Sequence, residues 1–279
     1  MLDTTQIQDT LSIDDEAMDN VHYPDCHLLV LLGDKTLSYA IFNTATNQFI
    51  ALHRLPAATD AVRLKVIENT AVFSQRFGAV KLGLIEKAFT FVPITLFLPD
   101  STSAYLNSNE GSEQLIVNDH FVSALDVHSI FSYSALVMES VKNYFLNLNC
   151  YPLSAVLLQQ IVKENRGQRK DLLHLTITEH YLYLFGFKNG DFVFGNRFHF
   201  DTETELLYFL LAVNEHYGFS TDNTGIKLAG DVTLYQPAIS RFFKHVEPVA
   251  KPQAYRYSAL MEALPSGSHY ELFSLKGCE

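Results

Sequence analysis

The stretch from Leu28 to Leu55, LLVLLGDKTLSYAIFNTATNQFIALHRL, is echoed about 144 residues later by Leu172 to Phe198, LLHLTITEHYLYLFGFKNGDFVFGNRF. Each copy opens with an apolar strand, breaks at a polar pair and then alternates apolar and polar residues, a pattern that predicts a second strand. After a turn of Asn- and Gly-type residues, a third strand closes on an arginine, Arg54 or Arg197. The repetition predicts two similar lobes, each built on a three-stranded antiparallel meander.

The composition is that of a folded protein. With 279 residues, of which 48% are hydrophobic, the chain can bury one large core or two of ordinary size. The formal net charge is −11, so we expect no nucleic-acid partner, because phosphate backbones are bound through clusters of Lys and Arg. A positively charged partner fits this charge balance better.

The cysteines and the first residues bear on the compartment. Cys26, Cys150 and Cys278 are odd in number and irregularly spaced, which is typical of reduced thiols rather than of a disulfide framework. The start, MLDTTQIQDTLSIDDEAMDN, is acidic where a signal peptide is basic and then apolar. The longest apolar stretches, Leu28 to Leu32 and Leu206 to Val213, fall short of the roughly 20 residues that span a bilayer. We therefore expect a cytoplasmic protein without a membrane span.

Both halves follow the order strand, meander, helix, strand, helix. Thr59 can cap a helix with apolar positions Val62, Val66 and Phe73 that ends at Gly78. In the second half, Thr202 and Glu205 form a capping box before a helix that ends at Gly218. Strands are expected at Val80 to Glu86 and Phe89 to Phe97, joined as a hairpin by Lys87 and Ala88, with Pro93 at an edge. Between them and the middle of the chain we expect a loop or short helix at Asp100 to Ser112 and an extended segment at Phe121 to Tyr133. The remaining expected elements are helices at Leu136 to Phe145, Leu153 to Glu164 and Leu234 to Val246, and strands at Leu148 to Tyr151 and Ile226 to Asp231.

The boundary between the halves is expected at the polar run KENRGQRK, from Lys163 to Lys170, where apolar periodicity lapses. It gives a first lobe of residues 1–166 and a second lobe of residues 167–279.

This order, present twice, is similar to the ribonuclease H-like unit that is duplicated in the actin-like ATPase superfamily. Shorter motifs, FTFVPITLF at Phe89 to Phe97, NRFHF at Asn196 to Phe200 and the terminal Cys278-Glu279, resemble a family of uncharacterised bacterial proteins with an actin-like ATPase fold and no established activity. The resemblance covers most of the chain as topology. It implies an α/β protein of two lobes, each a mixed sheet flanked by helices, with a cleft between them.

Active members of the superfamily carry an aspartate at the end of the first strand of each lobe, followed by glycine and a hydroxyl residue, to hold phosphates and magnesium. With Gly33 aligned to the glycine, the aspartate position of the first lobe holds Leu31. In the second lobe Thr176 replaces the aspartate and Thr178 the glycine. A third motif, a Gly-Gly turn at the adenosine, is matched in part by Ala229-Gly230-Asp231, because a Cβ at Ala229 restricts close backbone approach.

Losing both carboxylates removes the largest electrostatic contribution to phosphoryl transfer, so we expect hydrolysis to be weak or absent. The leading hypothesis is a degenerate, non-hydrolysing scaffold or assembly partner in the cytoplasm, with no catalytic residue and no cofactor beyond weak ATP and magnesium binding. The alternative is a nucleotide-dependent enzyme, an ATPase or small-molecule kinase, with Asp34, Glu179 or Asp231 in place of the lost carboxylates. The candidate nucleotide-site residues are Gly33, Asp34, Lys35, Thr178, Glu179, Gly230 and Asp231.

Two other groups of residues bear on metal binding and on a partner. His22, Cys26 and His27 match no common zinc spacing, so no metal site is predicted there. Aromatic residues alternate along the second meander, which favours one face on the core but leaves open an exposed strip that binds an unidentified protein partner. The aromatic residues of this meander are Tyr181, Tyr183, Phe185, Phe187, Phe192 and Phe194. The oligomeric state is not predicted.

Overall fold

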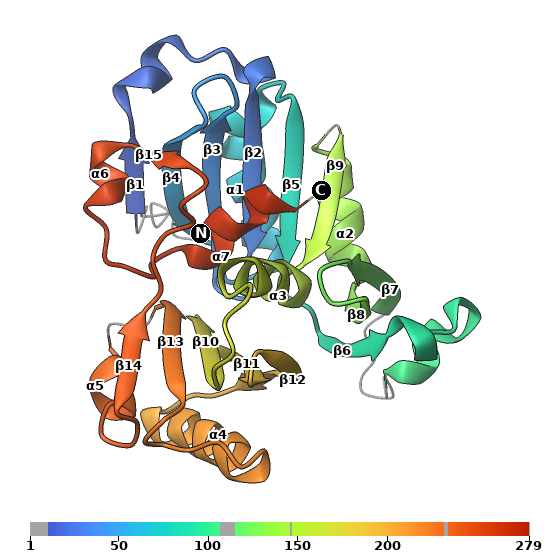
Figure 1. Cartoon of the computed structure of the whole chain (residues 1–279). Helices are drawn as coiled ribbons and strands as arrows, with labels where there is room; N and C mark the ends of the chain where they lie inside the picture. Colours follow the sequence, from blue (N-terminus) through green and yellow to red (C-terminus); the bar gives the residue numbers. More distant parts are fainter. Residues whose placement is uncertain (1–10, 107–114, 146, 232–233, 279) are drawn as a thin grey trace.

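The fold consists of two large mixed sheets and a smaller antiparallel one (Figure 1). This computed structural model describes residues 11–106, 115–145, 147–231 and 234–278. The first large sheet has the strand order β1-β4-β3-β2-β5-β9, and β15 pairs with β4 in parallel. Its strands are β1 (Leu11–Asp14), β2 (Cys26–Leu32), β3 (Thr36–Asn43), β4 (Gln48–Pro56), β5 (Ala79–Leu84), β9 (Leu148–Pro152) and β15 (Arg256–Tyr257).

The second large sheet repeats this arrangement, with the order β12-β11-β10-β13-β14. Its strands are β10 (Leu172–Thr178), β11 (Tyr181–Lys188), β12 (Asp191–His199), β13 (Gly225–Gly230) and β14 (His245–Pro248). In both sheets an antiparallel meander, β2-β3-β4 or β10-β11-β12, is extended by parallel strands beside its first member. The predicted duplicated α/β architecture is therefore confirmed.

Helices form three layers around the two sheets. Apolar side chains of α1 (Asp60–Asn69) and α2 (Ala135–Lys142) pack on the outer face of the first sheet, and those of α4 (Glu203–His216) and α5 (Gln236–Ile239) on the outer face of the second. Between the sheets lie α3 (Leu153–Glu164) and α7 (Tyr270–Ser274), which contact each other (Figure 1). Their apolar residues belong to one core that both lobes share.

Several predicted helices are confirmed in detail. The Thr59 hydroxyl accepts a hydrogen bond from Val62 N, and Thr202 and Glu205 make both bonds of a capping box at the start of α4. The bounds of α3 match the prediction, and its apolar residues belong to the core that both lobes share. Two predicted helices were too long. Residues 60–78 form α1 and then a separate 3₁₀ turn (Ala71–Ser74), while residues 234–246 form only the four-residue α5, followed by β14; a further short helix is α6 (Ala259–Glu262).

The predicted hairpin of residues 80–97 is wrong. After β5 the chain leaves the first sheet, and β6 (Ala88–Pro93) pairs instead with β8 (Val127–Ser134), which also pairs with β7 (Leu115–Val122). This three-stranded sheet projects from the first lobe (Figure 1). The segment predicted as one extended piece, residues 121–133, therefore holds the turn between β7 and β8. Pro93 ends an edge strand, as predicted. Residues 107–112 of the predicted loop lie outside the described residues.

The aromatic face of the second meander is buried rather than exposed. Tyr183, Phe185 and Phe187 are at most 4% exposed. Phe91 of β6 packs edge-on against Phe192, with ring centroids 5.5 Å apart. The alternative of an exposed docking strip is thus wrong for the centre of this meander, because the small sheet covers it.

The division into residues 1–166 and 167–279 stays a prediction. The C-terminal segment returns to the first lobe, where β15 lies beside β4 and the Lys81 ammonium donates to the carbonyl of Lys276 at 3.1 Å.

None of the helices within the described ranges combines the length and apolarity that crossing a bilayer requires.

Two glycines allow a test of what fixes the end of β13. Gly230 and Gly167 share a φ of +79°, but a Cβ at Gly230 would lie 2.0 Å from the Ile177 carbonyl oxygen, whereas a Cβ at Gly167 would meet nothing within 4 Å. We expect Gly167→Ala to lower the free energy of unfolding by about 1 kcal/mol through backbone strain alone. Gly230→Ala adds the clash with the Ile177 carbonyl oxygen, and we expect it to lower the free energy of unfolding by about 3 kcal/mol or more. Urea unfolding of both variants checks this; equal losses would contradict it.

Candidate functional site

The first hairpin turns of the two lobes meet between the sheets. In the first lobe the turn joins β2 to β3 through residues 33–35, and in the second it joins β10 to β11 through residues 179–180. In the superfamily that the sequence resembles, these are the turns expected to face a nucleotide. Here they contact each other directly.

The carboxylate of Glu179 is held by the first turn. Its Oε2 accepts hydrogen bonds from Asp34 N at 2.7 Å and Lys35 N at 3.1 Å, while Oε1 accepts from Thr36 N and Thr36 Oγ1, both at 2.8 Å. Successive backbone N–H groups that converge in a turn form an anion-binding nest. The amide nest of residues 34–36 is therefore occupied by an anion of the protein itself.

The backbone of both turns is shaped for this contact. A Cβ on Gly33 would lie 2.3 Å from Glu179 Oε1, so only glycine permits the approach. Glu179 has a φ of +52°, in the left-handed region that non-glycine residues seldom adopt. On the other side, the Arg63 guanidinium donates to the carbonyls of Gly33 at 2.7 Å and Asp34 at 2.9 Å. The amide nest is thus fixed from behind while its open side receives the carboxylate.

Side chains flanking the nest add further contacts between the lobes. The Lys35 ammonium contacts His180 Nε2, and the Tyr181 hydroxyl donates to Asp34 Oδ2. Burial and this bond to a carboxylate raise the pKa of Tyr181 to about 12. The Arg197 guanidinium lies over the Tyr181 ring, 4.2 Å from its centroid.

Two arginines cross between the lobes in opposite directions. Arg54 ends the first meander and pairs with Asp231, which follows β13, at 3.1 Å; its other nitrogen lies 3.9 Å from Glu271 of α7. Arg197 ends the second meander and donates to the carbonyl of Lys87, which follows β5, at 2.9 Å. The sequence has an arginine at the end of each meander, for which no role was predicted. Its recurrence at one position in both copies was the signal for these contacts.

Two buried acids lie under these arginines. Glu86 accepts hydrogen bonds from Ser154 N at 2.7 Å and from the Tyr183 hydroxyl at 2.9 Å, and its burial raises its pKa. Burial also raises the pKa of Glu271 to about 7, against the opposing effect of Arg54. Neither acid was singled out from the sequence, because a single Glu after a strand or in a short helix carries no spacing signal.

The structure brings several predicted site residues together. Gly33, Asp34, Lys35 and Glu179 form the contact between the turns, and Asp231 belongs to the Arg54 ion pair. Thr178 and Gly230 lie at the ends of the neighbouring strands β10 and β13. Their assignment to a nucleotide site stays a prediction.

At the two positions where the superfamily has aspartates, Leu31 is 4% exposed and Thr176 is fully buried, and the Thr176 hydroxyl has no hydrogen-bond partner among residues 11–106, 115–145, 147–231 and 234–278. Within the described ranges, no three side chains among His, Cys, Asp and Glu converge in a way that could hold a metal ion.

Comparison of structures identifies the class of fold. A Bacteroides thetaiotaomicron protein with an actin-like ATPase fold and unknown function superposes with a TM-score of 0.77 at 17% identity, over 92% of this chain and 97% of that one. A protein of the PilM-PilN type IV pilus biogenesis complex superposes with a TM-score of 0.63 at 12% identity, over 91% and 98% of the two chains. The fold is that of the actin-like ATPases.

The family follows from the sequence. Residues 15–248 match the family described as "Protein of unknown function (DUF3822)", and the chain belongs to that family. No curated protein sequence matches the chain.

Removing the Glu179 carboxylate tests what it contributes to the joining of the lobes. Glu179→Ala leaves three backbone N–H groups and one hydroxyl without their acceptor, and we expect a loss of about 2 kcal/mol in the free energy of unfolding, since the site is partly open to water. The control is Glu215→Ala, an exposed glutamate of α4, expected to change stability by no more than about 0.5 kcal/mol. Equal stability of the two variants in chemical denaturation would show that the contact contributes nothing.

The raised pKa of Glu271 predicts a pH dependence. A carboxyl group whose pKa rises on folding, here from 4.5 to about 7, stabilises the folded state below pH 4.5, and this contribution is lost as the pH rises toward 7. Relative to Glu271→Gln, the wild type is therefore expected to lose up to about 3 kcal/mol between pH 4.5 and 7.5. Urea unfolding of both proteins across this range measures the difference, and parallel stability curves would contradict the prediction.

Proposed function

We propose that this protein is a non-hydrolysing member of the actin-like fold that acts in the cytoplasm as a scaffold or assembly partner. The observation that carries the proposal is the Glu179 carboxylate in the amide nest of residues 34–36. A phosphate bound at this turn would need the same backbone N–H groups. The protein's own carboxylate therefore competes with a nucleotide for them.

The competition between Glu179 and a nucleotide lowers the affinity for the nucleotide. A nucleotide that enters the nest must displace Glu179 from four donors and leave a carboxylate beside a triphosphate of the same sign. If this displacement costs about 2 kcal/mol, nucleotide affinity falls roughly 30-fold, before any repulsion is counted. With Leu31 and Thr176 at the aspartate positions, a magnesium ion also finds no carboxylate at either of these two positions. Catalysis of phosphoryl transfer by positioning and charge neutralisation then lacks its main groups.

The alternative, a nucleotide-dependent enzyme, needs Asp34, Glu179 or Asp231 as metal-holding carboxylates. Each of the three is engaged within the protein: Asp34 by the Tyr181 hydroxyl, Glu179 by the amide nest and Asp231 by Arg54. An enzyme would have to break these contacts in order to use them, so their pairing favours the scaffold.

A protein partner is the second part of the proposal. The PilM likeness supports it at the level of the fold, since that protein was solved as part of a PilM-PilN complex. The net charge of −11 favours a protein partner over a nucleic acid.

Nucleotide independence is tested by a thermal-shift titration with ATP and magnesium, together with a phosphate-release assay. We expect no rise in melting temperature at millimolar nucleotide and no phosphate release above the buffer rate, because a ligand that binds the native state must stabilise it. Glu179→Ala, which vacates the nest, is the matched variant and is expected to respond to ATP more than the wild type does. A wild-type response with phosphate release would support the enzyme instead.

The partner is tested by a pull-down with this protein as bait. Recovery of the bound protein should be unchanged after apyrase removes nucleotides, and loss of recovery would contradict the scaffold.

A further inference from the structure

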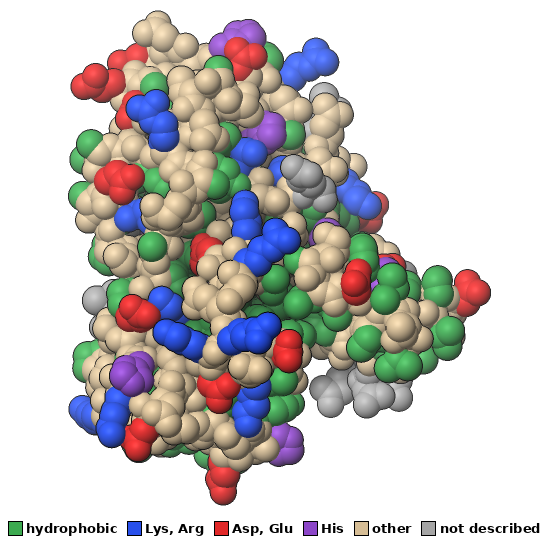
Figure 2. All heavy atoms as spheres, in the orientation of Figure 1, with side chains coloured by type: hydrophobic (Ala, Val, Ile, Leu, Met, Phe, Trp, Pro, Cys, Tyr) green, Lys and Arg blue, Asp and Glu red, His purple; other side chains and the backbone are tan. Residues whose placement is uncertain are grey.

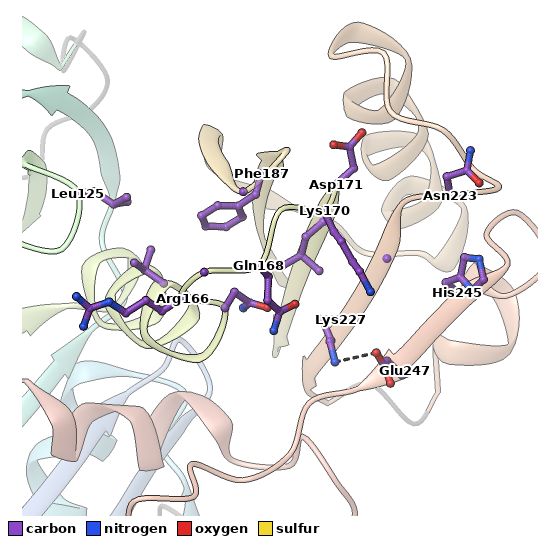
Figure 3. A pocket seen from close by; sticks show the side chains of 16 residues that line it. Leu125, Arg166, Gln168, Lys170, Asp171, Phe187, Asn223, Lys227, His245 and Glu247 are labelled. Carbon is purple, nitrogen blue, oxygen red and sulfur yellow. Dashed lines mark ion pairs between the residues drawn. The ribbon is translucent and has the colours of Figure 1, made fainter.

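Two adjoining cavities lie on the inner face of the second sheet, where strands β10, β13 and β14 begin. Their volumes are about 670 Å³ and 420 Å³, and they share Asn165, Gln168 and Lys227. The loop of residues 165–171, which joins α3 to β10, contributes lining residues to both, and Figure 3 shows the lining of the larger one. The turn that carries Glu179 lies at the other end of β10. We refer to the two cavities together as the basal hollow.

The floor of the basal hollow is a row of three side chains at one register. His174 of β10 lies opposite Lys227 of β13, which lies opposite Glu247 of β14. Lys227 and Glu247 form an ion pair at 2.8 Å (Figure 3). His174 lines the smaller cavity and is 1% exposed, yet neither of its ring nitrogens has a hydrogen-bond partner in the part of the chain that the structure describes. No neighbouring strand or helix among the described residues therefore supplies a hydrogen bond to this ring.

The unsatisfied imidazole requires an explanation. Burial, with Lys227 nearby, lowers the pKa of His174 to about 3, so the ring is neutral at pH 7 and offers one donor and one acceptor. A buried polar group left unpaired costs about 1–3 kcal/mol. An apolar residue at this position would avoid that cost. The unpaired ring nitrogens can instead form hydrogen bonds with a polar group that enters the cavity from outside.

The charge around the basal hollow selects the sign of that group. Lys163, Arg166 and Lys170 line it from the end of α3 and from the loop, and none has an ion-pair partner among the described residues. In Figure 2, Lys and Arg side chains gather across the middle of this face, although the chain as a whole carries −11. Of the lining acids, Glu164 already accepts from the Tyr270 hydroxyl at 2.9 Å, and Asp171 from the backbone N–H of Asn189 at 2.9 Å.

We propose that the basal hollow binds a small organic anion, a carboxylate or phosphate ester, whose polar group pairs with His174 and whose charge is matched by Lys227 and the loop cations. Ligand pockets are typically about 300–1,000 Å³, and the two cavities fall in this range. Apolar side chains at Leu172, Phe187 and Val249 provide a surface for the carbon skeleton. This site is independent of the nest that holds Glu179.

Binding is tested with citrate and glycerol 3-phosphate as probes and glycerol as the neutral control, by thermal shift and calorimetry at constant ionic strength. The wild type is expected to be stabilised by at least one of the two anions and not by glycerol. A response to citrate alone identifies a carboxylate site, and a response to glycerol 3-phosphate alone identifies a phosphate ester site. No response to either anion overturns the proposal.

Variants locate the effect. Lys227→Met is expected to weaken binding of the responsive anion at least tenfold, whereas Lys244→Met, which removes a lysine equally paired with an acid (Asp222, 3.0 Å) but outside the basal hollow, should leave it unchanged. His174→Leu is expected to abolish the response. If that variant fails to fold, Lys163→Met serves as the second test, with a weaker response expected.

Equal responses in all variants would show general charge screening and overturn the site. A gain in stability for His174→Leu with the anion response intact would show that the ring is only an unpaired core residue, which also overturns it. Glu179 and its nest are untouched in these variants, so an ATP response that Lys227→Met loses belongs to the basal hollow, whereas an ATP response that Lys227→Met keeps belongs to the nest.

Discussion

The contact between the Glu179 carboxylate and the amide nest of residues 34–36 sets how the two lobes of this protein stand to each other. It joins two turns that are 144 residues apart in sequence and correspond in the two copies of the meander. A backbone nest offers its donors to any anion of suitable shape. In this chain the donors are satisfied from within, so the cleft has lost the free amides that a phosphate would use. The Arg63 bonds fix the nest from within the first lobe, and the Lys35–His180 contact adds a second link between the two turns.

The two crossing arginines extend this closure along the cleft. Arg54 and Arg197 end equivalent strands, yet Arg54 meets the carboxylates of Asp231 and Glu271, while Arg197 meets backbone carbonyls and the Tyr181 ring. The duplication therefore supplies the same cation twice, and local sequence decides what each one binds. Charged partners held in a half-buried cleft are screened less by salt than exposed pairs are, so these contacts resist opening more than surface ion pairs would.

The sequence predicted the parts of the fold that rest on local or repeated patterns. The echoed meanders, the capping box at Thr202 and the bounds of α3 need only periodicity and end signals, and all are confirmed. The β6 pairing was mispredicted, because Lys87 and Ala88 look like a hairpin link and nothing local shows that β6 leaves the sheet to pair with β8. For the site, residues at the turns could be proposed from the resemblance. That Glu179 would enter the opposite turn could not, since it depends on the distance between two lobes.

The filled nest also changes what could move these lobes. In a fold whose lobes close around a ligand, the ligand shifts the equilibrium only by the difference in its affinity for the closed and open states. Here Glu179, Arg54 and Arg197 supply contacts between the lobes from the protein itself. A nucleotide would have to break the Glu179 contact first and would therefore favour opening. In the scaffold that we propose, such a pair of lobes presents a fixed surface, and a partner that recognises it meets one conformation without first having to order it.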